Sequence, residues 1–364
     1  MADLKNLFSP LQLGRVELKN RAVMAPMTRS RAIDNVPNAL MAEYYAQRGG
    51  AGLIITEGVA PSPNGLGYAR IPGAFSEAQV EGWRGVADAV HAEGSRIVMQ
   101  LMHTGRIGHP LNLPEGAELL APSAVAAAGS MYTDQEGPQP HPTPRAMSEA
   151  DIEATLEEYV EAARNAVRAG FDGVELHGAN GYLIDQFINP AANQRDDAWG
   201  GSPSARNRFA VEAARRVAEA IGADRVGIRI SPYGAFNDLT PDFDGVEEQF
   251  VALAGALGEL KLAYLHIVDH ASMGAPEVPW SLKRQLREAF GGVIILSGGY
   301  DAERAEADLA EGRGELIAFG RPFLATPDLL ERFKQGAALN EPRMDLFYTP
   351  GPEGYTDYPT LSEG

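Results

Sequence analysis

The chain has 364 residues, of which 45% are hydrophobic and 22% charged, a balance that supplies a large core and gives no sign of disorder. Its formal net charge of −18 argues against nucleic acid or an anionic membrane as a partner. The sequence contains no cysteine, which excludes disulfides, thiolate nucleophiles and cysteine-ligated metal clusters.

Neither a basic, apolar leader nor an apolar run of about 18 residues occurs in the sequence. A cytoplasmic protein with no membrane segment is therefore expected. Composition does not decide between a monomer and a homodimer, because an apolar helix face packs a core and an interface alike.

The first expected element is a β-hairpin within residues 1–20, whose residues 8–18 alternate apolar and polar side chains. We expect it to cover the bottom of the main fold. Then, eight times in succession, an apolar run that predicts a buried strand is followed by a run with helical periodicity. The expected strands are 21–29, 51–60, 96–104, 174–176, 225–231, 263–269, 292–298 and 315–320, and the expected helices are 38–49, 77–93, a helix from Ser148, 203–221, 246–260, 282–290, 302–311 and 327–335.

Eight consecutive strand-helix units are typical of a closed (β/α)8 TIM barrel, so the fold class is α/β with a single domain over residues 1–364. A doubly wound open sheet is the alternative, but no G-x-G-x-x-G fingerprint supports it. Residues 105–147, rich in Pro, Gly and Ala, separate the third strand from its helix and predict an excursion over the barrel mouth. Ser148 and Asp151 have the spacing of a capping box at the start of that helix.

The fourth strand breaks into a polar loop that carries His177, Asn180 and Tyr182. His177 and Asn180 can each donate an N–H to one substrate oxygen, and Tyr182 can give up a proton. Two donors and one acid suit a reaction that forms an enolate and then protonates it. A capped turn with a satisfied core histidine is the alternative for this stretch alone.

Two glycine-containing motifs follow strands seven and eight, where TIM barrels place a phosphate site. They are SGG, with Gly298 and Gly299, and FGR, with Gly320 and Arg321. The glycines let backbone N–H groups approach a phosphate, and Arg321 adds a bidentate fork. Glycines also end strands for steric reasons alone, and this alternative stays open.

Arg229 alternates with Ile228 and Ile230, so it is expected to point into the barrel, where an anion must meet it. Glu175 faces the same way on the neighbouring strand, and we expect it to pair with Arg229. Gln100 offers both a carbonyl and an amide, and Thr28 offers a hydroxyl. Together with the phosphate motifs, these residues indicate a phosphorylated heteroaromatic cofactor across the barrel top.

From about Leu4 to Pro359 the chain resembles the old yellow enzyme family of FMN-dependent ene-reductases. The resemblance is carried by motifs whose order, spacing and strand placement agree with the family. They are APMTR at 25–29, TEG at 56–58, QLMHTGR at 100–106, HGANGYLIDQF at 177–187, NQRDDAWGGS at 193–202, RNRF at 206–209, SGG at 297–299 and FGRPFLATPDL at 319–329.

The resemblance implies a tightly bound, non-covalent FMN and NADPH or NADH as hydride donor. In this family, hydride passes to flavin N5 and then to an activated alkene in a ping-pong cycle. His177 and Asn180 would hold the substrate oxygen, and Tyr182 would be the proton donor. The implied FMN-binding residues are Pro26, Met27, Thr28, Gly58, Gln100, Arg229, Gly298, Gly299, Gly320 and Arg321, and the implied pocket walls are Tyr68, Met102 and Tyr348.

The resemblance also separates branches of the family. Thr28, where thermophile-like members usually have Cys, points to the classical branch of N-ethylmaleimide, nitrate-ester and morphinone reductases. Met102 stands where classical members often carry Trp, which predicts a wider pocket, unless Met102 is only barrel filler.

The expected function is therefore reduction of activated C=C bonds in enones and maleimides, with nitro compounds or nitrate esters as further candidates. A phosphate-binding TIM-barrel isomerase or lyase without flavin is one alternative, and a flavin-binding protein without turnover is another. The segment from His270 to Trp280 is expected to be a mobile cover. No metal is expected, because His103, His109 and His141 lack the spacing of a ligand motif.

Overall fold

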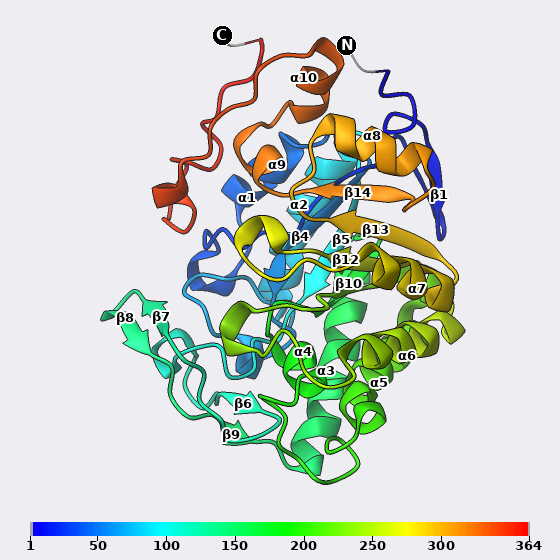
Figure 1. Cartoon of the computed structure of the whole chain (residues 1–364). Coiled ribbons are helices and arrows are strands. Elements are labelled where there is room, and N and C mark those ends of the chain that lie inside the picture. The colour runs from blue at the N-terminus through cyan, green and yellow to red at the C-terminus, as the bar shows by residue number, and fades with distance from the viewer. Residues whose placement is uncertain (1–2, 363–364) are drawn as a thin grey trace.

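Eight parallel strands close into a barrel in the computed structural model, which describes residues 3–362. The helices surround this barrel, and the hydrogen-bonded order of the strands follows the chain (Figure 1). The predicted TIM barrel is confirmed. The barrel strands are β3 (Ala22–Met24), β4 (Leu53–Val59), β5 (Arg96–Leu101), β10 (Gly173–Gly178), β11 (Val226–Ile230), β12 (Tyr264–Val268), β13 (Val293–Ser297) and β14 (Leu316–Phe319).

One main helix follows each barrel strand. Each packs an apolar stripe against the barrel, as Ile152, Leu156 and Tyr159 do in α3. The predicted capping box holds the start of α3, where the Ser148 side chain accepts from the backbone of Asp151 and Asp151 accepts from that of Ser148. The main helices are α1 (Ala39–Ala46), α2 (Glu77–Ala92), α3 (Glu149–Arg168), α5 (Pro203–Ile221), α6 (Val246–Glu259), α7 (Trp280–Phe290), α8 (Ala302–Ala310) and α10 (Leu329–Gln335).

Short elements fill several connections. The residues after Tyr182 form α4 (Leu183–Ile188). Helix α9 (Arg321–Ala325) was not predicted, because a five-residue helix has too little periodicity to recognise. The first barrel strand ends at Met24, so Thr28 lies in the following loop rather than in the strand. The 3-10 turns are η1 (Ile33–Asn35), η2 (Pro63–Gly65), η3 (Pro110–Asn112), η4 (Ala223–Arg225), η5 (Phe236–Asp238), η6 (Ala271–Met273) and η7 (Met344–Leu346).

The N-terminal hairpin closes the end of the barrel at which the strands begin. Its strands β1 (Leu11–Leu13) and β2 (Val16–Leu18) pair antiparallel. Leu13 and Leu18 are buried in one cluster with inward-facing barrel residues such as Val23 and Ile55. Burial of each leucine stabilises the fold by about 2 kcal/mol. The hairpin therefore plugs this end of the barrel interior, as expected.

The excursion, residues 105–147, covers one side of the opposite end of the barrel. It contains two small sheets that were not predicted: β6 (Leu120–Ala121) pairs with β9 (Arg145–Ala146), and β7 (Ser130–Thr133) pairs with β8 (Gly137–Pro140). In Figure 1 the β7–β8 hairpin projects on the same side of the molecule as the C-terminal segment. None of the helices within residues 3–362 combines the length and the apolar character that a membrane span needs.

Candidate functional site

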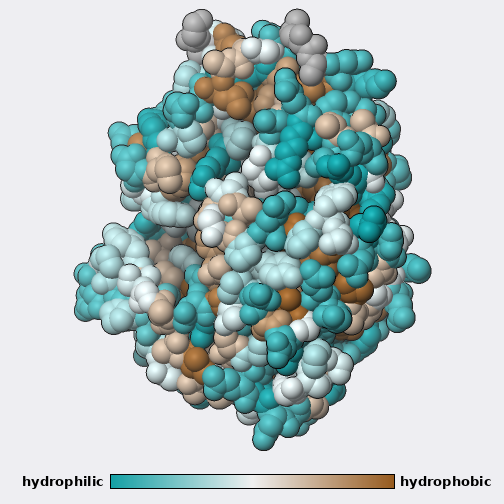
Figure 2. Space-filling view, in the orientation of Figure 1, coloured by the Kyte–Doolittle hydropathy of each residue, from teal (hydrophilic) through white to brown (hydrophobic). Residues whose placement is uncertain are grey.

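A cavity of about 550 Å³ opens at the carboxyl ends of the barrel strands. Figure 2 shows the surface hollowed on the left, between the β7–β8 hairpin and the C-terminal segment. Of the residues predicted for the site, Gly58 does not line this cavity. Those that do are Pro26, Met27, Thr28, Tyr68, Gln100, Met102, His177, Asn180, Tyr182, Arg229, Gly298, Gly299, Gly320, Arg321 and Tyr348.

The predicted donor pair lies where β10 ends. The His177 ring is buried and stands edge-on to the Tyr182 ring, with the centroids 5.0 Å apart. Burial and the nearby Arg229 charge hold the pKa of His177 well below its usual range, so the imidazole is neutral at neutral pH. Within the described chain, His177 Nδ1 and Asn180 Oδ1 are buried without a hydrogen-bond partner. Such atoms at a cavity wall are suited to a ligand.

A buried carboxyl group shapes the loop that carries Asn180. Asp185 Oδ2 accepts from the backbone N–H of Gly181 at 2.9 Å and from the Ser231 hydroxyl at 3.2 Å. The same hydroxyl oxygen accepts from the Asn180 N–H at 3.0 Å. Asn180 itself has a left-handed backbone with φ of 61°, which these contacts stabilise. Asp185 was not among the residues predicted for the site.

Tyr182 keeps its proton at neutral pH. Burial raises the pKa of this phenol, and its hydroxyl lies 2.9 Å from that of Tyr68. The predicted acid and the predicted pocket wall therefore meet directly, inside the cavity. A protonated phenol beside two N–H donors can supply a proton to a carbon next to a polarised group.

The predicted pairing of Glu175 with Arg229 was wrong. Glu175 Oε1 accepts from the Gln100 amide at 2.8 Å, and Oε2 lies 2.9 Å from His266 Nδ1. Among the described residues, Glu175 and Arg229 form no ion pair. Burial lowers the pKa of Arg229, and the Glu175 carboxylate opposes this lowering, so the two charges stabilise each other at longer range. Arg229 Nε therefore has no hydrogen-bond partner within residues 3–362, and Arg229 lines the cavity.

His266 was missed by the sequence analysis, although a signal for it existed. It pairs with Arg229 in the register of β11 and β12 and lies between Leu265 and Ile267, the same alternation that identified Arg229.

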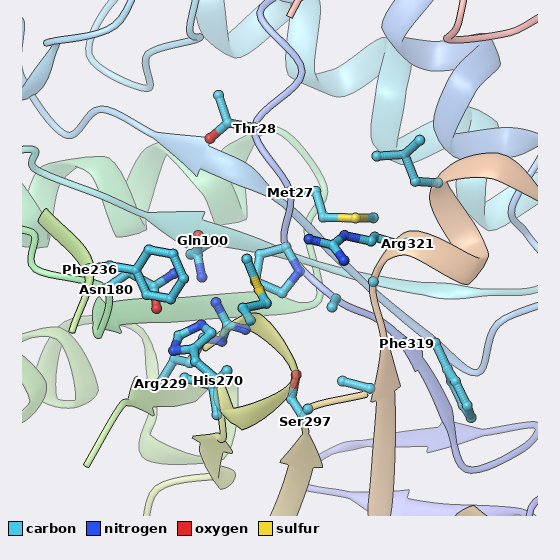
Figure 3. Close-up of a pocket in the computed structure, with 18 of the residues that line it drawn as sticks. Met27, Thr28, Gln100, Asn180, Arg229, Phe236, His270, Ser297, Phe319 and Arg321 are labelled. Carbon is cyan, nitrogen blue, oxygen red and sulfur yellow. The ribbon is translucent and has the colours of Figure 1, made fainter. Parts of the chain in front are cut away.

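The glycine motifs line the end of the cavity away from the donor pair. Figure 3 shows Arg321 on the side of the cavity opposite Asn180 and Phe236. Gly298 has φ of 140°, and a Cβ there would lie 2.3 Å from the carbonyl oxygen of Asp269, so no other residue fits. Asp269 is itself fixed by a buried ion pair with Lys283 at 2.6 Å.

Gly58 and Met102 are a packed pair. A Cβ on Gly58 would lie 2.4 Å from Met102 Sδ, so the glycine makes room for the methionine rather than for a ligand. Met102 is buried with Ala60, Leu66 and Ile71 and also lines the cavity. Both interpretations of Met102, as pocket wall and as filler, therefore apply to the same side chain.

The cavity mouth contains residues that the sequence analysis missed, since they lie in loops without periodicity. Phe236 packs edge-on against His270, with centroids 4.4 Å apart, and Met273, which is 51% exposed, lines the same cavity. Tyr348, which was predicted, lies at the mouth with 61% of its surface exposed. Part of the segment expected to be a mobile cover thus belongs to the wall, namely His270, Ser272 and Met273.

The segment that carries Tyr348, residues 343–360 and hereafter the tail, is held by buried arginines. Arg31 donates to the carbonyl oxygens of Phe347 at 2.7 Å and Glu353 at 2.8 Å, and Arg29 donates to Phe347 at 3.1 Å. Neither side chain is more than 1% exposed.

The residues present fit FMN. Arg229 Nε and His177 Nδ1 belong to residues of the cavity wall and have no partner in the part of the chain that the structure describes, which suits an aromatic ring with polar edges. Arg321 and the glycine motifs gather at one end, as a terminal phosphate requires.

Comparisons with known proteins agree with a site that fits FMN. Residues 6–340 match the model of the NADH:flavin oxidoreductase / NADH oxidase family. The chain is 44% identical to a chanoclavine-I aldehyde reductase of Penicillium roqueforti, over 99% of this chain and 98% of the relative. It is 40% identical to a probable flavin mononucleotide-dependent alkene reductase of Leishmania infantum, over 98% and 97%. The solved structure of a morphinone reductase superposes with a TM-score of 0.94 at 46% identity, covering 100% of this chain and 99% of that one.

Proposed function

This chain belongs to the old yellow enzyme family of NADH:flavin oxidoreductases, and from that premise we propose the reaction that its cavity carries out. The family makes it an FMN-dependent alkene reductase that uses NAD(P)H, and this removes the alternative of an isomerase or lyase without flavin. The substrates we propose are activated alkenes, namely enones and maleimides, with nitro compounds and nitrate esters as further candidates. The alkene would enter by the same mouth as the nicotinamide, in a ping-pong cycle.

The whole barrel would act as one FMN-binding domain. FMN, when bound, supplies a hydride acceptor and donor at N5. The phosphate would be held by Arg321 and the backbone of Gly298 and Gly299, and the ring by Arg229 and Gln100. Burial of the Arg229 guanidinium, which keeps an unpartnered Nε, supports this assignment. A positive charge at the ring favours the reduced, electron-rich state.

The observation that carries the proposal is the group formed by His177, Asn180 and Tyr182. A neutral His177 and the Asn180 amide would donate to the oxygen of an enone and stabilise the negative charge that develops there, commonly by about 3 kcal/mol per donor. Tyr182, protonated and bonded to Tyr68, would deliver a proton to Cα. The hydride at Cβ and this proton together complete the reduction of the C=C bond.

A visible spectrum of the purified protein tests the cycle. Yellow colour should bleach with NADPH in the absence of oxygen and return with 2-cyclohexenone. A protein that bleaches and does not recover would keep the cofactor and reject the proposed alkene.

The substitution Tyr182→Phe tests the proton donor. We expect the rate of alkene reduction to fall by about 10²-fold or more, the contribution of a general acid, while bleaching by NADPH stays within about threefold. The matched variant Tyr68→Phe keeps the Tyr182 hydroxyl and should lose less than about tenfold. Rapid-mixing measurements of the two half-reactions separate these rates. Equal losses in both half-reactions would count against Tyr182 as the acid, and an unchanged rate of alkene reduction would show that another group supplies the proton.

A further inference from the structure

Three segments that are far apart in the sequence meet at one side chain at the cavity mouth. Arg70 lies in the loop between β4 and α2. Its Nε donates to the carbonyl oxygen of Ser30 at 3.0 Å, and its Nη2 donates to the carbonyl oxygen of Tyr348 at 2.8 Å. Its Nη1 forms an ion pair with Asp134, in the turn between β7 and β8. One guanidinium thus bonds the loop after β3, the excursion and the tail.

The geometry of Arg70 is unusual for a surface arginine. Its side chain is only 12% exposed, against 44% for Asp134. Its backbone has φ of 55°, and so has its partner Ser30, with φ of 57°. A left-handed backbone at a residue other than glycine costs roughly 1 kcal/mol, and it persists only where the surroundings hold it in place. The Arg70 carbonyl is held by the N–H of Ala32 at 3.0 Å.

The segments that Arg70 joins carry the walls of the cavity. Tyr68, two residues before Arg70, bonds the proposed proton donor Tyr182. Tyr348, whose carbonyl oxygen Arg70 binds, lines the cavity with its side chain. Arg70 therefore links the segments that carry both tyrosines.

We propose that Arg70 is a positioning residue that fixes the width of the cavity mouth and thereby selects alkenes by size. This inference rests on the proposed function. Arg70 together with Ser30, Asp134 and Tyr348 is called the clasp. A guanidinium can bond three acceptors in one plane, which an ammonium cannot do, so the clasp requires arginine.

The substitution Arg70→Met removes all three bonds and keeps the length of the side chain. We expect KM for the small substrate 2-cyclohexenone to rise about five- to tenfold, with kcat within about threefold, because His177, Asn180 and Tyr182 are untouched. The preference for 2-cyclohexenone over a polycyclic enone, measured as the ratio of kcat/KM values, should fall by a similar factor. Arg70→Lys should give an intermediate loss.

Hydrogen exchange of the FMN-loaded protein gives a readout that does not depend on turnover. In Arg70→Met we expect faster exchange in residues 346–350 and in the β7–β8 hairpin, and no change in the barrel strands. Asp134→Asn should affect the hairpin alone, and weakly, because Asn112 also bonds the Tyr132 carbonyl oxygen at 2.9 Å. Arg164→Met, which removes an exposed ion pair of α3 with Glu161, is the matched control and should change neither exchange nor KM.

The outcomes separate the two ideas. If Arg70→Met leaves the KM values, the size preference and the exchange of residues 346–350 within about twofold of the parent chain, the clasp is rejected. Should that variant fail to fold, Arg70→Lys is judged by the same criteria. If the parent chain reduces neither alkene, the proposed function fails, and the exchange data alone decide whether Arg70 holds the mouth.

Discussion

At the scale of single residues, Asp185 makes the stability of the loop that carries Asn180 depend on pH. Burial raises the pKa of this carboxyl group to about 7, although the Gly181 N–H and the Ser231 hydroxyl favour the ionised form. In the unfolded chain an aspartate ionises near pH 4. Between those values the folded protein holds a proton that the unfolded chain has released. The stability contributed by Asp185 is therefore complete below about pH 4 and is lost as the pH rises through about 7.

The substitution Asp185→Asn removes this dependence and keeps an oxygen that can accept both hydrogen bonds. We expect the free energy of unfolding of the parent chain, relative to Asp185→Asn, to fall by about 1.4 kcal/mol per pH unit from pH 5 to 6 and less steeply as the pH approaches 7. Urea unfolding of both FMN-loaded proteins at four pH values measures this difference in free energy. The exposed Asp88→Asn is the control. A difference between parent and Asp185→Asn that stays constant with pH would show that Asp185 is ionised throughout.

The same scale shows how far the sequence determines the site. His177, Asn180, Tyr182 and Arg229 were identified because a polar residue in or after a buried strand is conspicuous, and the cavity contains all four. The predicted partner of Glu175 was wrong, because alternation shows which side chains face inward but not which two form a hydrogen bond or ion pair. His266, one strand further on, competes for the same carboxylate and was not considered.

At the scale of elements, the N-terminal plug depends on one close approach. Gly14, between β1 and β2, has φ of 52°, and a Cβ there would lie 2.1 Å from the carbonyl oxygen of Asp224. The hairpin therefore reaches its place under the barrel only with glycine in the turn. The next residue, Arg15, forms an ion pair with Asp224 at 2.6 Å and stabilises the same contact.

Gly14→Ala should destabilise the fold by roughly 2–4 kcal/mol, since it combines backbone strain with a clash that must lift the hairpin. Gly116→Ala is the matched control, because Gly116 also has a positive φ, 84°, but has open space where the Cβ would stand. That variant should cost only about 1 kcal/mol. Urea unfolding measures both. Equal costs would mean that the hairpin turn moves freely and that the plug does not depend on this contact.

Elements were predictable where periodicity was long enough. The eight strand-helix units, the hairpin and the α3 capping box came from patterns of several turns or from paired signals. The sheets of the excursion and α9 did not, because strands of two to four residues and a five-residue helix span at most about two periods of their pattern. The mouth residues Phe236 and Met273 belong to such short elements, and only the folded chain brings them to the cavity.

At the scale of the whole molecule, the net charge of −18 works against the compact state through self-repulsion. Salt screens this repulsion. We expect the melting temperature of the FMN-loaded protein to rise by about 2 °C or more between low salt and roughly 0.5 M NaCl, equivalent to about 1 kcal/mol. Choline chloride at the same ionic strength should act equally. A response to sodium alone would indicate specific ion binding, and no response to either salt would show that the negative charges are already far enough apart.

The buried arginines of the first loop have a consequence for the order in which the chain matures during synthesis. Arg31 and the Glu353 carbonyl oxygen that it binds are 322 positions apart, and Arg29 and Phe347 are 318 apart. A ribosome makes the first strand-helix unit early and the tail only after all eight barrel strands. Until the tail emerges, these guanidinium groups stay hydrated, because burying a charge without hydrogen-bond acceptors costs free energy. The first unit to be translated is thus the last to reach its final packing.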